Sequence, residues 1–229
     1  MQFLHEGQTA AVRAIAARIA EELTTGKRVL WLVGGGGNAS REVEVMALVR
    51  KRAEAQLGGL AILPTDERYG SPGHPDSTIQ RLRRAGLEPG NATLVDVLMH
   101  NLPFDQTLSF YTDVTATAFA NAGVIIGQFG LGNDGRIAGV VPDGPAAAAD
   151  EVTVAGYQWQ DHAQLTLTPA ALAQMQVAYV LAYGQAKKRV LERLQANTDT
   201  LTSLPAKSLY QIPEVYVYND QLENQQNKE

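Results

Sequence analysis

The stretch that decides the fold is 28–38, which reads RVLWLVGGGGN. Residues 29–33 are an almost unbroken apolar run of strand length, and four consecutive glycines, Gly34 to Gly37, follow directly. A strand without alternation of apolar and polar residues is typical of a parallel sheet covered on both faces. Because residues 42–56 have helical spacing, this part of the chain predicts a strand, a loop and a helix in succession.

Apolar runs and helical patterns alternate in the same way along the rest of the chain. Further strands are expected at residues 60–63, 92–98, 124–129, 163–167, 177–183 and 215–218. Further helices are expected at residues 8–23, from 76 to about 86, at 105–122, from 169, and at 185–195. Residues 137–141 could open a helix that Pro142 would truncate. The pattern predicts an α/β fold: a mostly parallel, Rossmann-like sheet covered by helices on both faces.

The composition is that of a globular chain with a sizeable core. The sequence has 229 residues, of which 45% are hydrophobic, and it shows no internal repeat. We expect one α/β domain over residues 1–220 and a polar tail over 221–229. No apolar run approaches the roughly 20 residues that a membrane helix needs.

Charge and cysteine content narrow the classes of function. There is no cysteine, which excludes disulfides, thiolate metal sites and a cysteine nucleophile and fits a cytoplasmic location. The N-terminus lacks the basic and apolar regions of a secretory signal. A net charge of −5 argues against a nucleic-acid partner, although a few local cations could still bind a small anion.

In parallel sheets ligands bind beyond the carboxyl ends of the strands, so the loops there are the candidate site. The first such loop is Gly34–Asn38, whose amides at the start of a helix suit a phosphate. The alternative is a flexible turn without a ligand, because the spacing matches neither a Walker loop nor a dinucleotide fingerprint.

The second loop begins with Thr65-Asp66-Glu67-Arg68, directly after a predicted strand. Arg68 could clamp a phosphate while a neighbouring carboxylate moves a proton, but a salt-bridged surface turn is equally compatible with the sequence. Downstream, His74 could supply a base. The interpretation that we prefer there is a helix cap, provided by Asp76 or Ser77.

Two later loops complete the candidate site. Gly130–Arg136 has three glycines with Asp134 and Arg136 between or beside them, which favours a tight functional loop over a simple turn. Lys187 follows Gly184 at a strand-to-helix junction and could reach a phosphate. Taken alone, Lys187 is better explained as part of the solvated face of a helix.

In this order, the segments resemble the family of 6-phosphogluconolactonases and glucosamine-6-phosphate isomerases. The resemblance runs from Arg28 to Asp220, nearly the whole chain. It rests on segments 34–38, 65–68 with 76–77, 130–142 and 184–187, and on Pro205-Ala206 and Asp220. The lactonase branch fits better, because the aminosugar branch has Phe-Asn-Glu-Pro where this chain has Gly139-Val-Val-Pro142.

The resemblance implies a sugar-phosphate isomerase type of fold and the hydrolysis of 6-phospho-D-glucono-1,5-lactone to 6-phosphogluconate, in the pentose phosphate pathway. It implies no metal and no organic cofactor. The phosphate would contact Gly34, Gly35, Gly36, Gly37, Asn38, Arg68 and Lys187. A general base would activate the attacking water, and nearby donors would stabilise the oxyanion.

Three positions depart from the family pattern. Arg136 stands where the family has the histidine usually assigned as the base, and a guanidinium cannot accept a proton near neutral pH. The hydroxyl of the glycine loop is replaced by Gly37 or Asn38, and Gln164 replaces a phosphate-binding arginine. Arg136 could compensate for that lost cation.

The departure at Arg136 leaves the base and the activity open. Asp66, Asp134 and His74 are the candidate bases, and Asp66, Asp134 and Arg136 are the expected catalytic residues. A non-catalytic sugar-phosphate binder on the same scaffold is the main alternative. An aminosugar-phosphate isomerase or deaminase is a weaker one.

Overall fold

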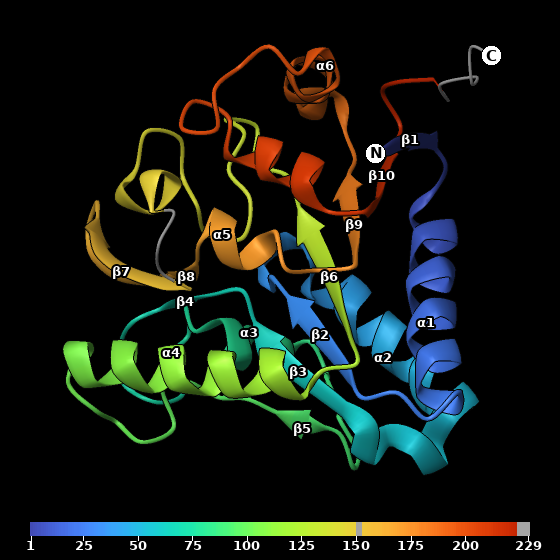
Figure 1. The fold of residues 1–229 in the computed structure, drawn as a ribbon, viewed down its shortest axis with the longest axis vertical. Coiled ribbons are helices and arrows are strands. Elements are labelled where there is room, and N and C mark those ends of the chain that lie inside the picture. Colours follow the sequence, from blue (N-terminus) through green and yellow to red (C-terminus); the bar gives the residue numbers. More distant parts are fainter. Residues whose placement is uncertain (150–152, 224–229) are drawn as a thin grey trace.

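The computed structural model describes residues 1–149 and 153–223 and is built around a seven-stranded sheet (Figure 1). The strand order is β1-β10-β9-β6-β2-β3-β5, and every neighbouring pair is parallel. The strands are β1 (Gln2–His5), β2 (Val29–Val33), β3 (Leu60–Pro64), β5 (Thr93–Leu94), β6 (Val124–Gly130), β9 (Val177–Ala182) and β10 (Glu214–Asn219). The parallel sheet predicted from the apolar runs is confirmed.

Helices cover both faces of this sheet, as predicted. They are α1 (Gln8–Thr24), α2 (Ala39–Ala53), α3 (Thr78–Arg84), α4 (Phe104–Asn121), α5 (Pro169–Leu172) and α6 (Lys188–Ala196). Side chains of α1, α2 and α3 form one apolar core with the sheet, and those of α4, α5 and α6 form another. Among the described residues, no helix is both long and apolar enough to cross a membrane.

Short 3-10 helices complete the connections: η1 (Gly36–Asn38), η2 (Glu54–Gly59), η3 (Pro145–Ala148), η4 (Gln185–Lys187) and η5 (Pro205–Gln211). Two of them, η1 and η4, lie directly before α2 and α6. The helix expected at 42–56 is therefore α2, which begins earlier, followed by η2. Part of the expected tail, 224–229, lies outside the described residues, whereas Leu222 packs against the core.

A second, three-stranded antiparallel sheet is a feature that the sequence analysis misses. It consists of β4 (Asp66–Arg68), β8 (His162–Leu167) and β7 (Val154–Trp159), in the order β4-β8-β7. The strand expected at 163–167 therefore exists but does not belong to the large sheet. Figure 1 shows this small sheet to one side of the large one.

Two expected elements differ from the structure. The strand expected at 92–98 is reduced to the two residues of β5. The helix proposed for residues 137–141 is wrong, because Ile137 and Val140 form an antiparallel bridge and exchange backbone hydrogen bonds of 3.2 and 2.8 Å. Ala138 and Gly139 between them have positive φ angles, which an α-helix does not allow.

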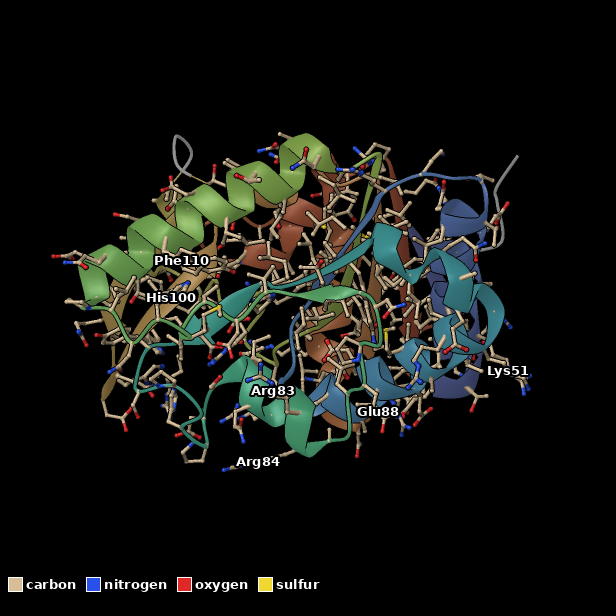
Figure 2. The ribbon with its side chains drawn as sticks, turned by 90° about the horizontal axis from the view of Figure 1, so that it is seen from below. Lys51, Arg83, Arg84, Glu88, His100 and Phe110 are labelled. Atoms are coloured by element: carbon tan, nitrogen blue, oxygen red, sulfur yellow. The ribbon has the colours of Figure 1, made fainter. Side chains whose placement is uncertain are left out.

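Aromatic packing links the chain before α4 to that helix. The rings of His100 and Phe110 meet edge to face with centroids 5.0 Å apart, and Figure 2 shows the two side chains together. On the same view Arg84 projects from α3 into solvent.

The order of the strands determines where a ligand can bind. From the adjacent strands β2 and β6 the chain continues in opposite directions, to β3 and β5 on one side and to β9 and β10 on the other. The loops after β2 and β6 therefore leave a crevice at the carboxyl edge of the sheet.

Candidate active site

A cavity of about 670 Å³ lies at this crevice. Its walls come from the loops after β2, β6 and β9 and from one face of the small sheet. The residues lining it that the sequence analysis names are Gly34, Gly35, Gly36, Gly37, Asn38, Asp66, Arg68, Gly130, Arg136, Gly139, Gln164 and Lys187. Segments far apart in sequence thus meet around one space.

The glycine loop is partly occupied by a carboxyl group of the protein itself. Gly34 and Gly35 donate their amides to Oε1 of Glu42, at 2.9 and 3.1 Å, and Glu42 is completely buried. In the described part of the chain, the amides of Gly36 and Gly37 have no protein acceptor. An anion in the cavity would therefore find free donors at the second half of the loop.

Glycine is required at Gly35 for two reasons. Its φ angle is +58°, and a Cβ atom there would lie 2.8 Å from Cγ2 of Thr78. This conformation brings the loop close to the start of α3.

Asp66 is the carboxyl group best placed to move a proton. Its Oδ1 accepts a hydrogen bond of 3.1 Å from Thr65, and its Oδ2 accepts one of 3.0 Å from Gln164. Burial raises the pKa of the Asp66 carboxyl to about 6, although both hydrogen bonds act to lower it. Such a carboxylate is ionised at neutral pH and is a stronger base than an ordinary aspartate.

The neighbouring residue Glu67 has a structural role instead. Its buried carboxylate accepts hydrogen bonds from the hydroxyl of Ser77 and from the amides of Thr78 and Ile79 at the start of α3. Ser77 caps the same helix, since its hydroxyl accepts from the amide of Gln80. The preferred interpretation of Asp76-Ser77 as a cap is therefore confirmed, with Ser77 as the capping residue.

Arg68 lies on the cavity wall but is held by neighbours. Its guanidinium donates to Asp76 at 2.8 Å and to Nδ1 of His162 at 2.8 Å. His74, a candidate base, is not a cavity residue. Its Nε2 lies 2.9 Å from the backbone oxygen of Arg68.

Asp134 and Arg136 form a closed pair in the loop after β6. Nε and Nη2 of Arg136 donate to Oδ2 of Asp134 at 2.9 and 2.8 Å. Although burial acts to raise it, these contacts hold the pKa of the Asp134 carboxyl below its ordinary value. Arg136 lines the cavity and Asp134 does not, so Asp134 orients the cation and is a poor candidate base.

Lys187 enters the cavity from η4, after β9. Its ammonium donates to the backbone oxygen of Leu131. Burial lowers the pKa of this ammonium. The charge of Asp134 acts to raise the pKa, and the charge of Arg136 acts to lower it further. Lys187 is thus a half-buried cation facing the loop after β6, rather than part of a solvated helix face.

The small sheet supplies site residues that the sequence analysis does not name. In an antiparallel pair, residues directly opposite each other project to the same face. The pairs Arg68–Gln164, Tyr157–Gln164 and Trp159–His162 are all in register, and all of these residues line the cavity. The sequence analysis did not predict β7. Without the pairing of β7 with β8, the sequence does not show that Tyr157 and Trp159 lie on the same face as His162 and Gln164.

The loop after Ile137 approaches this face closely. Gly139 has a φ angle of +76°, and a Cβ atom there would lie 2.5 Å from Cβ of Asp66. Its backbone oxygen accepts a hydrogen bond of 2.8 Å from the hydroxyl of Tyr157. The loop thereby packs directly against the proposed base.

Within residues 1–149 and 153–223, no group of three or more His, Asp or Glu side chains could hold a metal ion. The protein itself supplies one carboxylate with a raised pKa, the three cations Arg68, Arg136 and Lys187, and the free backbone amides of Gly36 and Gly37.

Comparison with known proteins identifies relatives of the chain. The family described as glucosamine-6-phosphate isomerases/6-phosphogluconolactonase matches residues 5–216. Among curated protein sequences, no significant match to the chain is found.

Solved structures share the fold at low sequence identity. A 6-phosphogluconolactonase from Shewanella baltica superposes with a TM-score of 0.76 at 17% identity, covering 95% of this chain and 96% of its own. A 6-phosphogluconolactonase from Trypanosoma cruzi gives 0.74 at 18% identity, covering 96% and 94%. A monomeric glucosamine-6-phosphate deaminase gives 0.77 at 13% identity, covering 96% and 97%. At these identities the comparison shows a common fold.

Proposed function

Because the chain belongs to the family of glucosamine-6-phosphate isomerases and 6-phosphogluconolactonases, we propose that it hydrolyses 6-phospho-D-glucono-1,5-lactone to 6-phosphogluconate. The observation that carries the proposal is the placement of Asp66. A carboxyl group with a raised pKa shares one cavity with the cations Lys187 and Arg136 and with the free amides of Gly36 and Gly37. These are the groups that a phosphorylated lactone and an attacking water require.

The phosphate of the substrate is assigned to the end of the cavity near the glycine loop. Gly36 and Gly37 would donate their amides, and Lys187 would supply a positive charge from the opposite loop. Asn38 lies at the same place, against Gly130. Gly34 and Gly35 shape the loop rather than bind the phosphate, because Glu42 already accepts their amides.

The reaction then needs one proton to be moved twice. Asp66 takes a proton from water while the water oxygen bonds to C1 of the lactone and the carbonyl electrons move to the carbonyl oxygen. When the oxyanion collapses, the bond between C1 and the ring oxygen breaks, and protonated Asp66 returns the proton to the ring oxygen. The guanidinium of Arg136, held by Asp134, adds positive charge near the developing anion.

The lactonase branch is proposed over the aminosugar branch because of the loop at 139–142, which reads GVVP and lacks the Phe-Asn-Glu-Pro of that branch. A second candidate is a non-catalytic sugar-phosphate binder. The observation favouring it is Arg136, which stands where the family pattern has a histidine and cannot act as a base.

The proposal is tested by following the hydrolysis of freshly prepared lactone against its spontaneous decay. We expect the wild type to accelerate the decay and Asp66→Asn to lower kcat by about 100-fold or more, as for the loss of a general base. Asp134→Asn should cost much less, and Asp113→Asn, on the exposed side of α4, should have no effect.

If the lactone decays no faster with the wild type than in buffer, the proposal that the protein is a lactonase is refuted. Tight binding of 6-phosphogluconate without turnover of the lactone would then support the second candidate, a non-catalytic sugar-phosphate binder. A fast reaction unaffected by Asp66→Asn would instead show that Asp66 is not the base.

A further inference from the structure

His162 is a cavity residue that the reaction described above leaves unused. It begins β8, pairs with Trp159 on β7, and lies two residues before Gln164 on the same face. Because a strand rises about 3.4 Å per residue, His162 is about 7 Å from Gln164, which holds Asp66. The imidazole and the proposed base therefore border the same part of the cavity.

The nitrogen Nδ1 of His162 has two neighbours that demand opposite protonation. Nη2 of Arg68 lies 2.8 Å from it, and Oδ1 of Asp161 lies 3.1 Å from it. A guanidinium can only donate, so the contact with Arg68 requires Nδ1 to accept and the proton of the neutral imidazole to reside on Nε2. The contact with Asp161 would require the proton on Nδ1.

Burial and positioning favour the contact with Arg68. The side chain of Asp161 is 83% exposed, so water and salt weaken its attraction. The side chain of Arg68 is 30% exposed and is also held by Asp76. Among the described residues, Nε2 of His162 has no protein partner.

We propose that Arg68 fixes His162 as the neutral tautomer protonated on Nε2, and that this N–H donates a hydrogen bond to the carbonyl oxygen of the bound lactone. The inference rests on the proposed function and adds a role for both residues. His162 would be a catalytic residue that stabilises the oxyanion, and Arg68 would be a positioning residue rather than a phosphate clamp.

The tautomer is tested without any assay of activity. The chain has four histidines, so nitrogen-15 NMR of the labelled full-length protein at pH 8 resolves a small set of rings. His162→Gln identifies the signals of His162 by their loss. We expect a protonated Nε2 and an unprotonated Nδ1, and a protonated Nδ1 in the wild type would overturn the proposal.

Replacing the arginine tests its part in setting the tautomer. In Arg68→Met, Asp161 becomes the remaining charged neighbour of Nδ1, so a form protonated on Nδ1 should appear. Arg81→Met is the matched control, because Arg81 also pairs with Asp76 but does not contact His162. Arg68→Lys keeps a donor and should retain the wild-type tautomer. An unchanged spectrum in Arg68→Met would contradict the role of Arg68.

Kinetics test the donated hydrogen bond. His162→Leu should lower kcat by about 100-fold or more with KM changed less than about twofold, whereas His162→Gln, which retains an N–H near Nε2, should recover most of kcat. Arg68→Met should also lower kcat more than it raises KM. A rise in KM alone, with weaker competition by inorganic phosphate, would make Arg68 a phosphate clamp and overturn the proposal.

The two proposals fail in different ways. Absence of lactone hydrolysis by the wild type refutes the proposed function, and the tautomer measured by NMR remains a separate result. Hydrolysis that is normal in His162→Leu refutes the further inference alone.

Discussion

The side-chain amide of Gln164 donates a hydrogen bond of 3.0 Å to Oδ2 of Asp66, across 98 residues of sequence and between two strands of the small sheet. The family resemblance leads us to expect an arginine in the place of Gln164. A neutral donor in that place stabilises the carboxylate less than a cation would, so Asp66 keeps the raised pKa that burial gives it.

This relationship predicts the pH dependence of the reaction. A base must be deprotonated to act, so kcat/KM should rise with pH and level off above about 6, the pKa of Asp66. Gln164→Met removes a hydrogen bond to the charged form and should shift this limb to higher pH. Gln164→Arg places a cation beside the carboxylate and should shift it to lower pH.

The measurement is a pH–rate profile of the three proteins, corrected for spontaneous hydrolysis at each pH. Shifts of the two variants in the same direction would contradict the assignment of this limb to Asp66.

Lys187 is expected to bind the phosphate group. Lys187→Met should raise KM for the phosphorylated lactone by about tenfold or more, because it removes a charge-assisted hydrogen bond, and should leave the rate with unphosphorylated glucono-1,5-lactone unchanged. Lys188→Met is the matched control, since Lys188 is the adjacent lysine and is exposed. Equal effects on both substrates would place the phosphate elsewhere.

Arg136 is expected to contribute charge and not proton transfer. Arg136→Gln should lower kcat, since the cation beside the developing anion is lost. Arg136→His should give a higher kcat than Arg136→Gln, because an imidazole can accept a proton where the guanidinium cannot. Steady-state kinetics near pH 8 separate kcat from KM. Equal kcat values in the two variants would show that position 136 does not reach the attacking water.

The buried carboxyl of Glu42 should make stability depend on pH. Burial raises its pKa from 4.5 to about 8, against the lowering effect of the hydrogen bonds from Gly35 and Gly34. Between those values the folded chain keeps a proton that the unfolded chain has lost. The free energy of unfolding therefore falls as pH rises, by at most ~1.4 kcal/mol per pH unit for this group.

Glu42→Gln keeps an oxygen to accept from both glycines and removes the charge, so the fall between pH 5 and 8 should become shallower. Chemical denaturation at several pH values measures this slope. Glu44→Gln, two residues along α2 and exposed, is the control and should keep the wild-type slope. Some decline should persist in both variants, because burial also raises the pKa of Glu67, to about 7. Parallel curves for Glu42→Gln and the wild type would show that Glu42 does not titrate in this range.

The large sheet and its helices could be predicted because their signals are local. Strands such as β2, β6 and β9 are apolar on both faces, and the helices between them carry their own periodicity. The small sheet could not be predicted in the same way. Its strand β4 is the charged tripeptide Asp66–Arg68, which is a strand only because β8 pairs with it.

In the candidate site, too, some residues could be predicted from local sequence and others could not. Several site residues could be named from the sequence because each lies in a loop that follows a predicted strand. They are the glycine run, Asp66, Arg68, Arg136 and Lys187, and all of them line one cavity. Their partners could not be named. Glu42 looks like an ordinary charged residue of α2, yet it is fully buried beneath the glycine loop.

By itself, the sequence determined the alternation of strands and helices, the edge of the sheet at which a ligand binds, and the family. Only the tertiary structure decided which groups remain available there. Glu42 takes the first two glycine amides, Asp134 holds Arg136, and Arg68 contacts His162 across 94 residues of sequence. The physical reason is that hydrophobic periodicity is a property of neighbouring residues. Protonation and hydrogen-bond partners depend instead on which distant strands come into register.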